Sequence, residues 1–348
     1  MTTMSQMMIP LIAALMPLPL QQTKPKPAGG ADSGPYHVAR TLHVGGPGRW
    51  DYITVDSQNK VLYLPRTTHT QVIDCATGKV IADILGQKGN HGTAIANGRA
   101  FVSDGRDSAV VIIDTKTHQM LGKVKAAEDA DAIFYDSASN KVLVGCGDAG
   151  VLIPIAPDVD PKSGKADEPI KLGGKPESFA MDGKGKAYVA LEDKDMIAVV
   201  DTKSGKLITK WPTKPGGAPV GVAMDIEHGR IYVGCRKPQK FIVMSAEDGK
   251  VLADLPIGVG CDSARFDNGY AFASCRDGTL AVARETSPGK FEIVQTVETP
   301  QGCKTVDVDR TTHTLYLPTA EFSGSDARGR PSPKPDTFMI VVVEPTGK

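Results

Sequence analysis

Acidic side chains recur along the chain at matching places, each a few residues before a short apolar run. These acidic residues are Asp51, Asp131, Glu177 and Asp262. Carboxylate oxygens are the ligands that hard divalent cations prefer, and a bound cation acts as a Lewis acid in hydrolysis. One interpretation is therefore a divalent cation as cofactor, with ligands among Asp51, His91, Asp131, Glu177 and Asp262.

Basic side chains are also expected near these carboxylates and could form ion pairs with them. Arg66, Arg106 and Lys304 could pair with the carboxylates and neutralise them without any metal. Exposed ion pairs of this kind add little stability and need no function. The second interpretation is therefore a solvated, salt-bridged funnel.

The chain balances its charges, with 40 basic and 40 acidic residues among 348. No net field draws it to nucleic acid or to an anionic membrane, so neither partner is expected. Hydrophobic residues make up 41% of the chain, enough for a sizeable core, and 37 Gly and 25 Pro favour many turns.

The N-terminus is typical of an exported protein. Residues 1–22 contain an apolar stretch of signal-peptide length at 7–20, and residues 23–35 form a Pro/Gly linker. No basic residue precedes the stretch and no clean cleavage site follows it, so a cytoplasmic tail is the alternative. We expect a periplasmic or secreted protein without a transmembrane segment, because two prolines interrupt a stretch that is short for a membrane span.

A repeat of about 42 residues organises the rest of the chain. Four-residue runs that end in Asp or Asn recur seven times, with the last residue at 56, 97, 136, 182, 225, 267 and 309. Each marker opens a turn, and an aromatic-aliphatic strand follows, as in VLYL (61–64) and RIYV (230–233). Two more strands complete each copy, and the short loops leave no room for crossover helices.

The seventh copy lacks its fourth strand, because the chain ends after FMIVVVEPTGK (338–348). The segment YHVARTLHVGG (36–46) is strand-like and has no other partner. We therefore predict an all-β fold, a seven-bladed β-propeller of four-stranded antiparallel blades over residues 36–348, closed by the N-terminal strand completing blade seven. Such closure protects sheet edges that would otherwise be exposed.

Units that read Asp, turn, YV, loop, VxVID and TGKV resemble the YVTN-repeat β-propeller family over residues 36–348. The resemblance implies a seven-bladed propeller, often exported, in a family whose members are mostly uncharacterised or act as binding proteins. The dipeptide Trp50-Asp51 lies before the first strand of its copy, so it does not match a WD40 repeat.

The repeat predicts which residues meet. In a propeller the first strand of each blade lines the central channel, and its start shares a face with the loop between the second and third strands. The residues expected at this channel mouth are Trp50, Asp51, Arg66, His91, Asp104, Arg106, Asp131, Glu177, Asp262 and Lys304. The insertion 324–336 in blade seven should overhang them.

Five of the six cysteines are expected at the same mouth: Cys146, Cys235, Cys261, Cys275 and Cys303. Three interpretations stay open. Two disulfides, Cys235–Cys261 and Cys275–Cys303, could staple adjacent blades. His91, Cys261 and Cys303 could bind a soft metal ion. The thiols could also pack as small apolar groups.

Two function classes follow. The first is an exported binding or interaction protein, expected to be a monomer, that holds an unknown small molecule or protein at the channel mouth. The second is a metal-dependent hydrolase or lactonase that uses a cation held by the carboxylates. No nucleotide-binding, zinc-protease or haem-attachment motif is present in the sequence.

Overall fold

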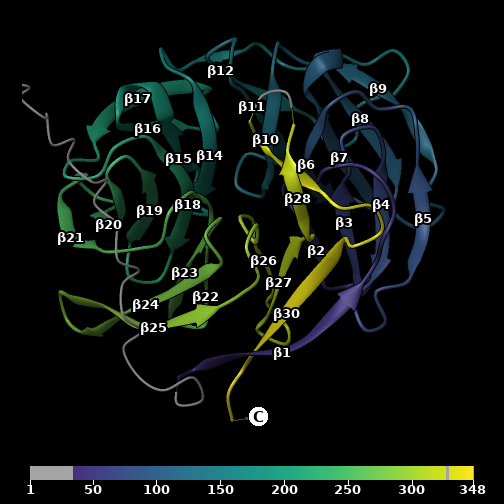
Figure 1. Ribbon diagram of the computed structural model, residues 1–348. Coiled ribbons are helices and arrows are strands. Elements are labelled where there is room, and N and C mark those ends of the chain that lie inside the picture. Colours follow the sequence, from purple (N-terminus) through teal and green to yellow (C-terminus); the bar gives the residue numbers. More distant parts are fainter. Residues whose placement is uncertain (1–33, 327–328, 348) are drawn as a thin grey trace, which may run out of the picture.

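The computed structural model describes residues 34–326 and 329–347, and nearly all of its regular structure is β-strand (Figure 1). The signal-peptide-like segment and the linker up to residue 33 lie outside the described residues. Seven four-stranded antiparallel sheets form the blades, and a two-stranded hairpin is added in blade seven. The predicted fold class is confirmed. Within the described residues, no helix is long and apolar enough to cross a membrane.

The strands follow the repeat in chain order. Blades one to three contain β2 Thr54–Asp56, β3 Val61–Pro65, β4 Thr70–Asp74, β5 Val80–Ile84, β6 Asn90–Ala96, β7 Arg99–Asp104, β8 Ala109–Asp114, β9 Met120–Lys125, β10 Ala130–Asp136, β11 Lys141–Cys146, β12 Val151–Ile155 and β13 Ile170–Lys171. Blades four and five contain β14 Pro176–Met181, β15 Lys186–Leu191, β16 Met196–Asp201, β17 Lys206–Pro212, β18 Pro219–Asp225, β19 Arg230–Arg236, β20 Gln239–Ser245 and β21 Val251–Leu255.

Blade six contains β22 Cys261–Asp267, β23 Tyr270–Cys275, β24 Thr279–Ser287 and β25 Lys290–Glu298. Blade seven contains β26 Asp307–Asp309, β27 Thr314–Thr319, β30 Met339–Pro345 and β1 Tyr36–His43, and the hairpin consists of β28 Phe322–Ser325 and β29 Pro331–Pro333. Two short 3₁₀ helices, η1 Gly105–Asp107 and η2 Glu192–Lys194, follow β7 and β15.

The repeated Asp residues form turns, as predicted. Asp56 accepts hydrogen bonds from the backbone N–H and the side-chain amide of Asn59, at 3.0 and 2.7 Å. Asp182 accepts from the backbone N–H of Gly185, and Asp309 from that of Thr311. These carboxylates satisfy backbone donors in the hairpin between the first and second strands, which is the usual role of Asp in a turn.

The N-terminal strand closes the ring. β1 pairs antiparallel with β30, from Tyr36 opposite Pro345 to His43 opposite Met339, and Figure 1 shows the two side by side. Gln295 of blade six also hydrogen-bonds the backbone N–H and C=O of Tyr36, at 3.0 and 2.6 Å. The predicted closure is therefore confirmed.

The core consists of seven apolar clusters, one at each interface between neighbouring blades. The cluster between blades one and two, for example, joins Tyr63 and Val72 to Val102 and Ile113. Tyr52 is an exception to this sequential order, because it comes from blade one and packs in the cluster of blades three and four. The aromatic side chain of Tyr52 therefore reaches across the centre of the propeller.

Candidate functional site

Irregularities at the starts of the first strands position the polar residues. The ladder between first and second strand slips between Asn90 and Thr93, Ala130 and Ile133, Pro176 and Phe179, Pro219 and Gly221, and Cys261 and Ser263. The residues left out of the ladder include His91, Asp131, Glu177 and Asp262. A bulge re-aims a side chain, so these residues leave the alternation of the strand at the same end of each blade.

A cavity of about 980 Å³ opens at this end of the molecule. Its walls come from blades one, two, three, six and seven, and the hairpin β28–β29 supplies Phe322, Arg330 and Pro331. Arg330 and Pro331, from the described part of the insertion in blade seven, therefore border the mouth, where we predicted the insertion to lie. We call this space the mouth cavity.

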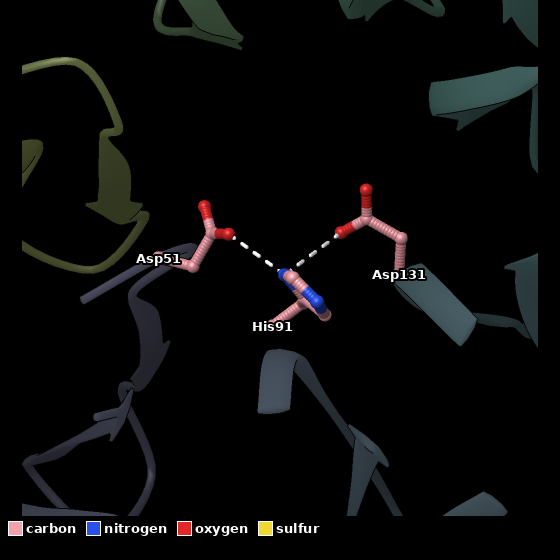
Figure 2. A group of neighbouring side chains, drawn as sticks. All are labelled: Asp51, His91 and Asp131. Carbon is pink, nitrogen blue, oxygen red and sulfur yellow. Dashed lines mark hydrogen bonds and ion pairs between the residues drawn. The ribbon is translucent and has the colours of Figure 1, made fainter. Parts of the chain in front are cut away.

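An Asp–His–Asp group borders the mouth cavity. His91 Nδ1 lies 2.9 Å from Asp51 Oδ2 and 3.6 Å from Asp131 Oδ1. Figure 2 shows the imidazole between the two carboxylates, and each of the three residues comes from a different blade. Asp51 and His91 belong to the cavity wall itself.

Ion pairs continue from this group into the neighbouring blades. Lys304 Nζ lies 3.1 Å from Asp51 Oδ1 and 2.5 Å from Asp262 Oδ2. Arg236 also contacts Asp262 and lies 2.7 Å from Glu192 Oε1. The network thus links blades one, seven, six, five and four through buried or half-buried side chains.

The network divides its acids into two kinds. Burial opposes the ionisation of Asp51, but Lys304 and His91 outweigh it and lower the Asp51 pKa to about 2. Burial likewise opposes ionisation of Asp262, and Lys304 and Arg236 lower its pKa. Asp131 lacks such a cation, so burial raises its pKa to about 7 despite the nearby His91. For His91, the two aspartates outweigh burial and raise the pKa to about 9.

Glu177 offers a stability test of this distribution of charge. Burial, the Asp131 charge and a hydrogen bond with Glu192 raise its pKa from 4.5 to about 9. A carboxyl with a higher pKa in the folded state makes the fold less stable as the pH rises from about 4.5 to about 9. Glu177→Gln resembles the protonated acid, so it should match the wild type near pH 5 and exceed its stability near pH 9 by about 1 kcal/mol or more.

Urea unfolding at several pH values measures this difference. The matched control is Glu298→Gln, because Glu298 is an exposed acid on β25, and it should leave the pH profile unchanged. Parallel profiles of unfolding free energy against pH for Glu177→Gln and the wild type would contradict a raised pKa at Glu177.

The structure brings together most of the residues predicted for the mouth. Those that line the cavity are Trp50, Asp51, Arg66, His91, Arg106 and Lys304. Asp131 and Asp262 join them through the ion pairs with His91 and Lys304. Glu177 interacts with Asp131 and Glu192. Arg66 is fully buried and its guanidinium already donates to the carbonyl oxygens of residues 45–49, so it supports the wall.

Asp104 is a correction to the prediction. It is fully buried and is not among the described residues that line the mouth cavity. Its carboxylate accepts from the backbone N–H of Lys88 and lies 3.0 Å from Lys123 Nζ on β9. Asp104 therefore joins the outer strand β9 to the loop that precedes β6.

Sequence reasoning missed Glu192 and Arg236 in the network and Arg276 in the cavity wall. Each of them follows directly after a residue at the end of a second strand, namely Leu191, Cys235 and Cys275, and we expected the two cysteines at the mouth. Those three are fully buried between blades. Side chains alternate along a strand, so a shift of one residue exchanges the buried face for the channel face. In the sequence, a charged residue directly after each of these apolar residues was the signal that could have identified the side chain facing the channel.

The alternation also explains the cysteines. All six are free and buried in the structure, so the predicted disulfides Cys235–Cys261 and Cys275–Cys303 are not formed. Cys261 is opposite Cys275 on the adjacent strand of the same blade. Burial raises the pKa of the thiols of Cys235 and Cys303 to about 12, which keeps them protonated. Their environment is that of small apolar groups packed between blades.

Comparisons with known proteins agree with the fold. No protein-family profile matches the chain, and no curated protein matches it significantly. Kuenenia stuttgartiensis hydrazine synthase is similar in structure, with a TM-score of 0.66 and 14% identity over 79% of this chain and 92% of that one. The Pan2 WD40 domain of Neurospora crassa has a TM-score of 0.68 and 13% identity, over 93% of this chain and 98% of that one. At such identities the likeness extends to the propeller fold alone.

Proposed function

We propose that this propeller is a binding protein that holds a small polar organic molecule in its mouth cavity. The observation that carries the proposal is the cavity itself, which has a volume of about 980 Å³ and converging charged groups. Ligand sites in proteins typically occupy about 300–1,000 Å³ and place a few polar groups on an apolar wall.

The wall favours a ligand with a flat or ring-shaped body and an anionic group. Trp50 and Phe322 lie side by side, with ring centroids 6.0 Å apart, and both line the cavity. Arg106 is exposed in the same wall and forms no ion pair with any residue in the described part of the chain. A carboxylate or phosphate on the ligand would give this guanidinium a bidentate partner.

Trp50 provides a direct reporter of binding. The chain has two Trp residues, so Trp211→Phe leaves Trp50 as the sole indole. We expect at least one compound from a panel of aromatic carboxylates, sugar acids and sugar phosphates to change Trp50 fluorescence saturably. Arg106→Ala should then weaken binding by about tenfold or more, since a charge-assisted pair contributes roughly 1.5–3 kcal/mol.

The matched control is Arg310→Ala. Arg310 lines a smaller cavity of about 230 Å³ formed by the opposite ends of the first strands, so its loss should leave the Trp50 titration unchanged. Compounds that bind equally well to both variants and to the parent protein would place the site elsewhere and refute the proposal.

Export and catalysis are further parts of the proposal. Export rests on the apolar stretch at 7–20, and mass spectrometry of protein from a periplasmic or culture fraction would test it. Metal-dependent hydrolysis, including lactone opening, is a second candidate function, favoured by the Asp51–His91–Asp131 group at the cavity wall. It requires a bound metal ion.

A further inference from the structure

We infer that Asp51, His91 and Asp131 bind one divalent transition-metal ion, of the Zn²⁺ class, at the wall of the mouth cavity. The inference rests on the proposed function for its location, because the ion would lie where the organic ligand is expected. It adds a chemical identity to that site: a metal ion with coordination positions open to a ligand oxygen.

The spacing of the donor atoms carries the inference. One atom from each residue can be chosen so that all three lie within 4.8 Å of one another. His91 Nδ1 is 2.9 Å from Asp51 Oδ2 and 3.6 Å from Asp131 Oδ1 (Figure 2). Ligands bonded to Zn²⁺ at about 2.0–2.1 Å lie roughly 2.9–3.4 Å apart at the corners of an octahedron or tetrahedron. The two distances from His91 are close to this range, and rotation of the aspartate side chains would bring both carboxylates to one ion.

A buried oxygen without a hydrogen bond is the second observation. Asp131 Oδ1 is buried and has no hydrogen-bond partner, and it faces His91 at the longer distance of 3.6 Å. An unsatisfied buried acceptor is costly and calls for an explanation, such as an ion. An ion between Asp131 and His91 would satisfy this oxygen and replace the proton that Nδ1 shares with Asp51.

The neighbouring cations leave this place available. Lys304 contacts the other oxygen of Asp51, Oδ1, and is held there by Asp262. Arg236 is engaged by Asp262 and Glu192. Asp51 Oδ2 and Asp131 Oδ1 are the carboxylate oxygens that approach His91 most closely, and Asp131 forms no ion pair with a Lys or Arg among the described residues.

The donor set selects the metal and indicates its role. Imidazole nitrogen suits Zn²⁺ and related transition ions, whereas Ca²⁺ and Mg²⁺ prefer all-oxygen sites. Three protein ligands leave at least one coordination position open, which is the arrangement of metal sites that bind a substrate or ligand. Asp51 and His91 line the mouth cavity, so an open position would face the space proposed for the organic molecule.

Isothermal titration of the EDTA-treated full chain with ZnCl₂ tests the inference. We expect one ion per chain in the wild type, and about 100-fold weaker binding in each of His91→Gln and Asp131→Asn. Both substitutions keep the size and polarity of the side chain while removing a metal donor. Thermal unfolding in EDTA checks that each variant is folded, and two independent variants keep the test decisive if one of them is not.

His313→Gln is the matched control. His313 Nδ1 lies 2.7 Å from Asp267 Oδ2, so it forms a similar His–Asp pair, and no other carboxylate joins it in a metal-binding group within the described chain. Zn²⁺ binding should be unchanged in this variant. The inference is overturned if the wild type binds no Zn²⁺ at millimolar concentration, or if His91→Gln and Asp131→Asn bind it as tightly as the wild type.

The two proposals fail separately. The Trp50 titration is repeated in EDTA and with saturating Zn²⁺. Organic ligands that bind in EDTA to a protein without Zn²⁺ affinity would refute the metal site and leave the proposed function standing. Stoichiometric Zn²⁺ binding that depends on His91 and Asp131, without any response of Trp50 to the panel, would support the metal site and count against the proposed ligand.

Discussion

Replacing Lys304 with methionine is expected to destabilise the protein by about 3–5 kcal/mol at neutral pH, the usual cost of removing one partner from a buried ion pair. The Lys304 side chain is 19% exposed and lies between Asp51 and Asp262, of which Asp262 is almost fully buried. Without the ammonium group, two carboxylates remain close together with less neutralising charge. Methionine keeps most of the aliphatic length, so lost packing contributes little.

The pH dependence of this effect follows from the direction of the pKa shifts. Against the effect of burial, Lys304 and His91 together lower the pKa of Asp51 to about 2, and Lys304 and Arg236 lower that of Asp262. The stability gained from these ionised aspartates is present above their ordinary value of 3.8 and is lost as the pH falls through the lower folded pKa. The two aspartates raise the pKa of Lys304, so its contribution is present below its ordinary value of 10.5 and is lost above it.

We therefore expect the difference between wild type and Lys304→Met to be largest between about pH 5 and pH 10 and to shrink as the pH falls from about 4 towards 2. Chemical unfolding across this range measures it. Lys290→Met is the control, because Lys290 is 64% exposed and pairs with Glu292 on the surface; it should cost less than about 1 kcal/mol. A small effect of Lys304→Met that does not vary with pH would show that the network contributes no stability.

Arg66→Met is expected to have a destabilising effect of similar size, about 3–5 kcal/mol, at every pH in the neutral range, because several buried carbonyl oxygens lose their donor at about 1–3 kcal/mol each. Arg66 is fully buried. Its guanidinium donates to the carbonyl oxygens of Gly45, Gly46, Pro47, Gly48 and Arg49, and to the side chain of Gln71 at 2.7 Å. It also lies over the Phe338 ring, 3.9 Å from the centroid.

These contacts hold the segment that leads from β1 of blade seven to β2 of blade one. Removing the guanidinium leaves a row of carbonyl oxygens without a donor beside the closure of the ring. Gly48 contributes to the same arrangement, because its φ of +97° suits glycine and a Cβ there would lie 2.7 Å from the Arg66 carbonyl oxygen. Burial lowers the pKa of Arg66 to about 10, so the side chain stays charged at neutral pH.

Two further variants test whether the planar set of donors on Arg66 is what stabilises this segment. One keeps the positive charge at residue 66, and the other removes a different contact between β1 and β30. Arg66→Lys keeps the charge but loses the planar set of donors, and it should recover only part of the lost stability. Arg40→Met removes an exposed ion pair with Glu344 between β1 and β30, and it should cost less than about 1 kcal/mol. Thermal unfolding should show a shift of roughly 6–12 °C for Arg66→Met. Equal shifts for Arg66→Met and Arg40→Met would contradict the assigned role.

The sequence by itself determined the architecture. Seven turn-forming Asp or Asn residues at regular spacing, each followed by an aromatic-aliphatic strand, predicted seven blades, and the unpaired segment at 36–46 predicted the closure. Local turn chemistry and strand alternation are properties of neighbouring residues, so a repeat displays them many times. The same alignment brought Asp51, His91 and Lys304 to one mouth without any knowledge of their contacts.

Only the tertiary structure decided which face each side chain occupies. A single residue separates Cys235 and Cys275, which are buried between blades, from Arg236 in the ion-pair network and Arg276 in the cavity wall. Bulges at the strand starts change this alternation, and their position depends on how two strands pair. Two other features also depend on residues that are distant in sequence. Tyr52 packs across the ring of blades, and Lys304 pairs with both Asp51 and Asp262. The local sequence pattern carries no information about such contacts.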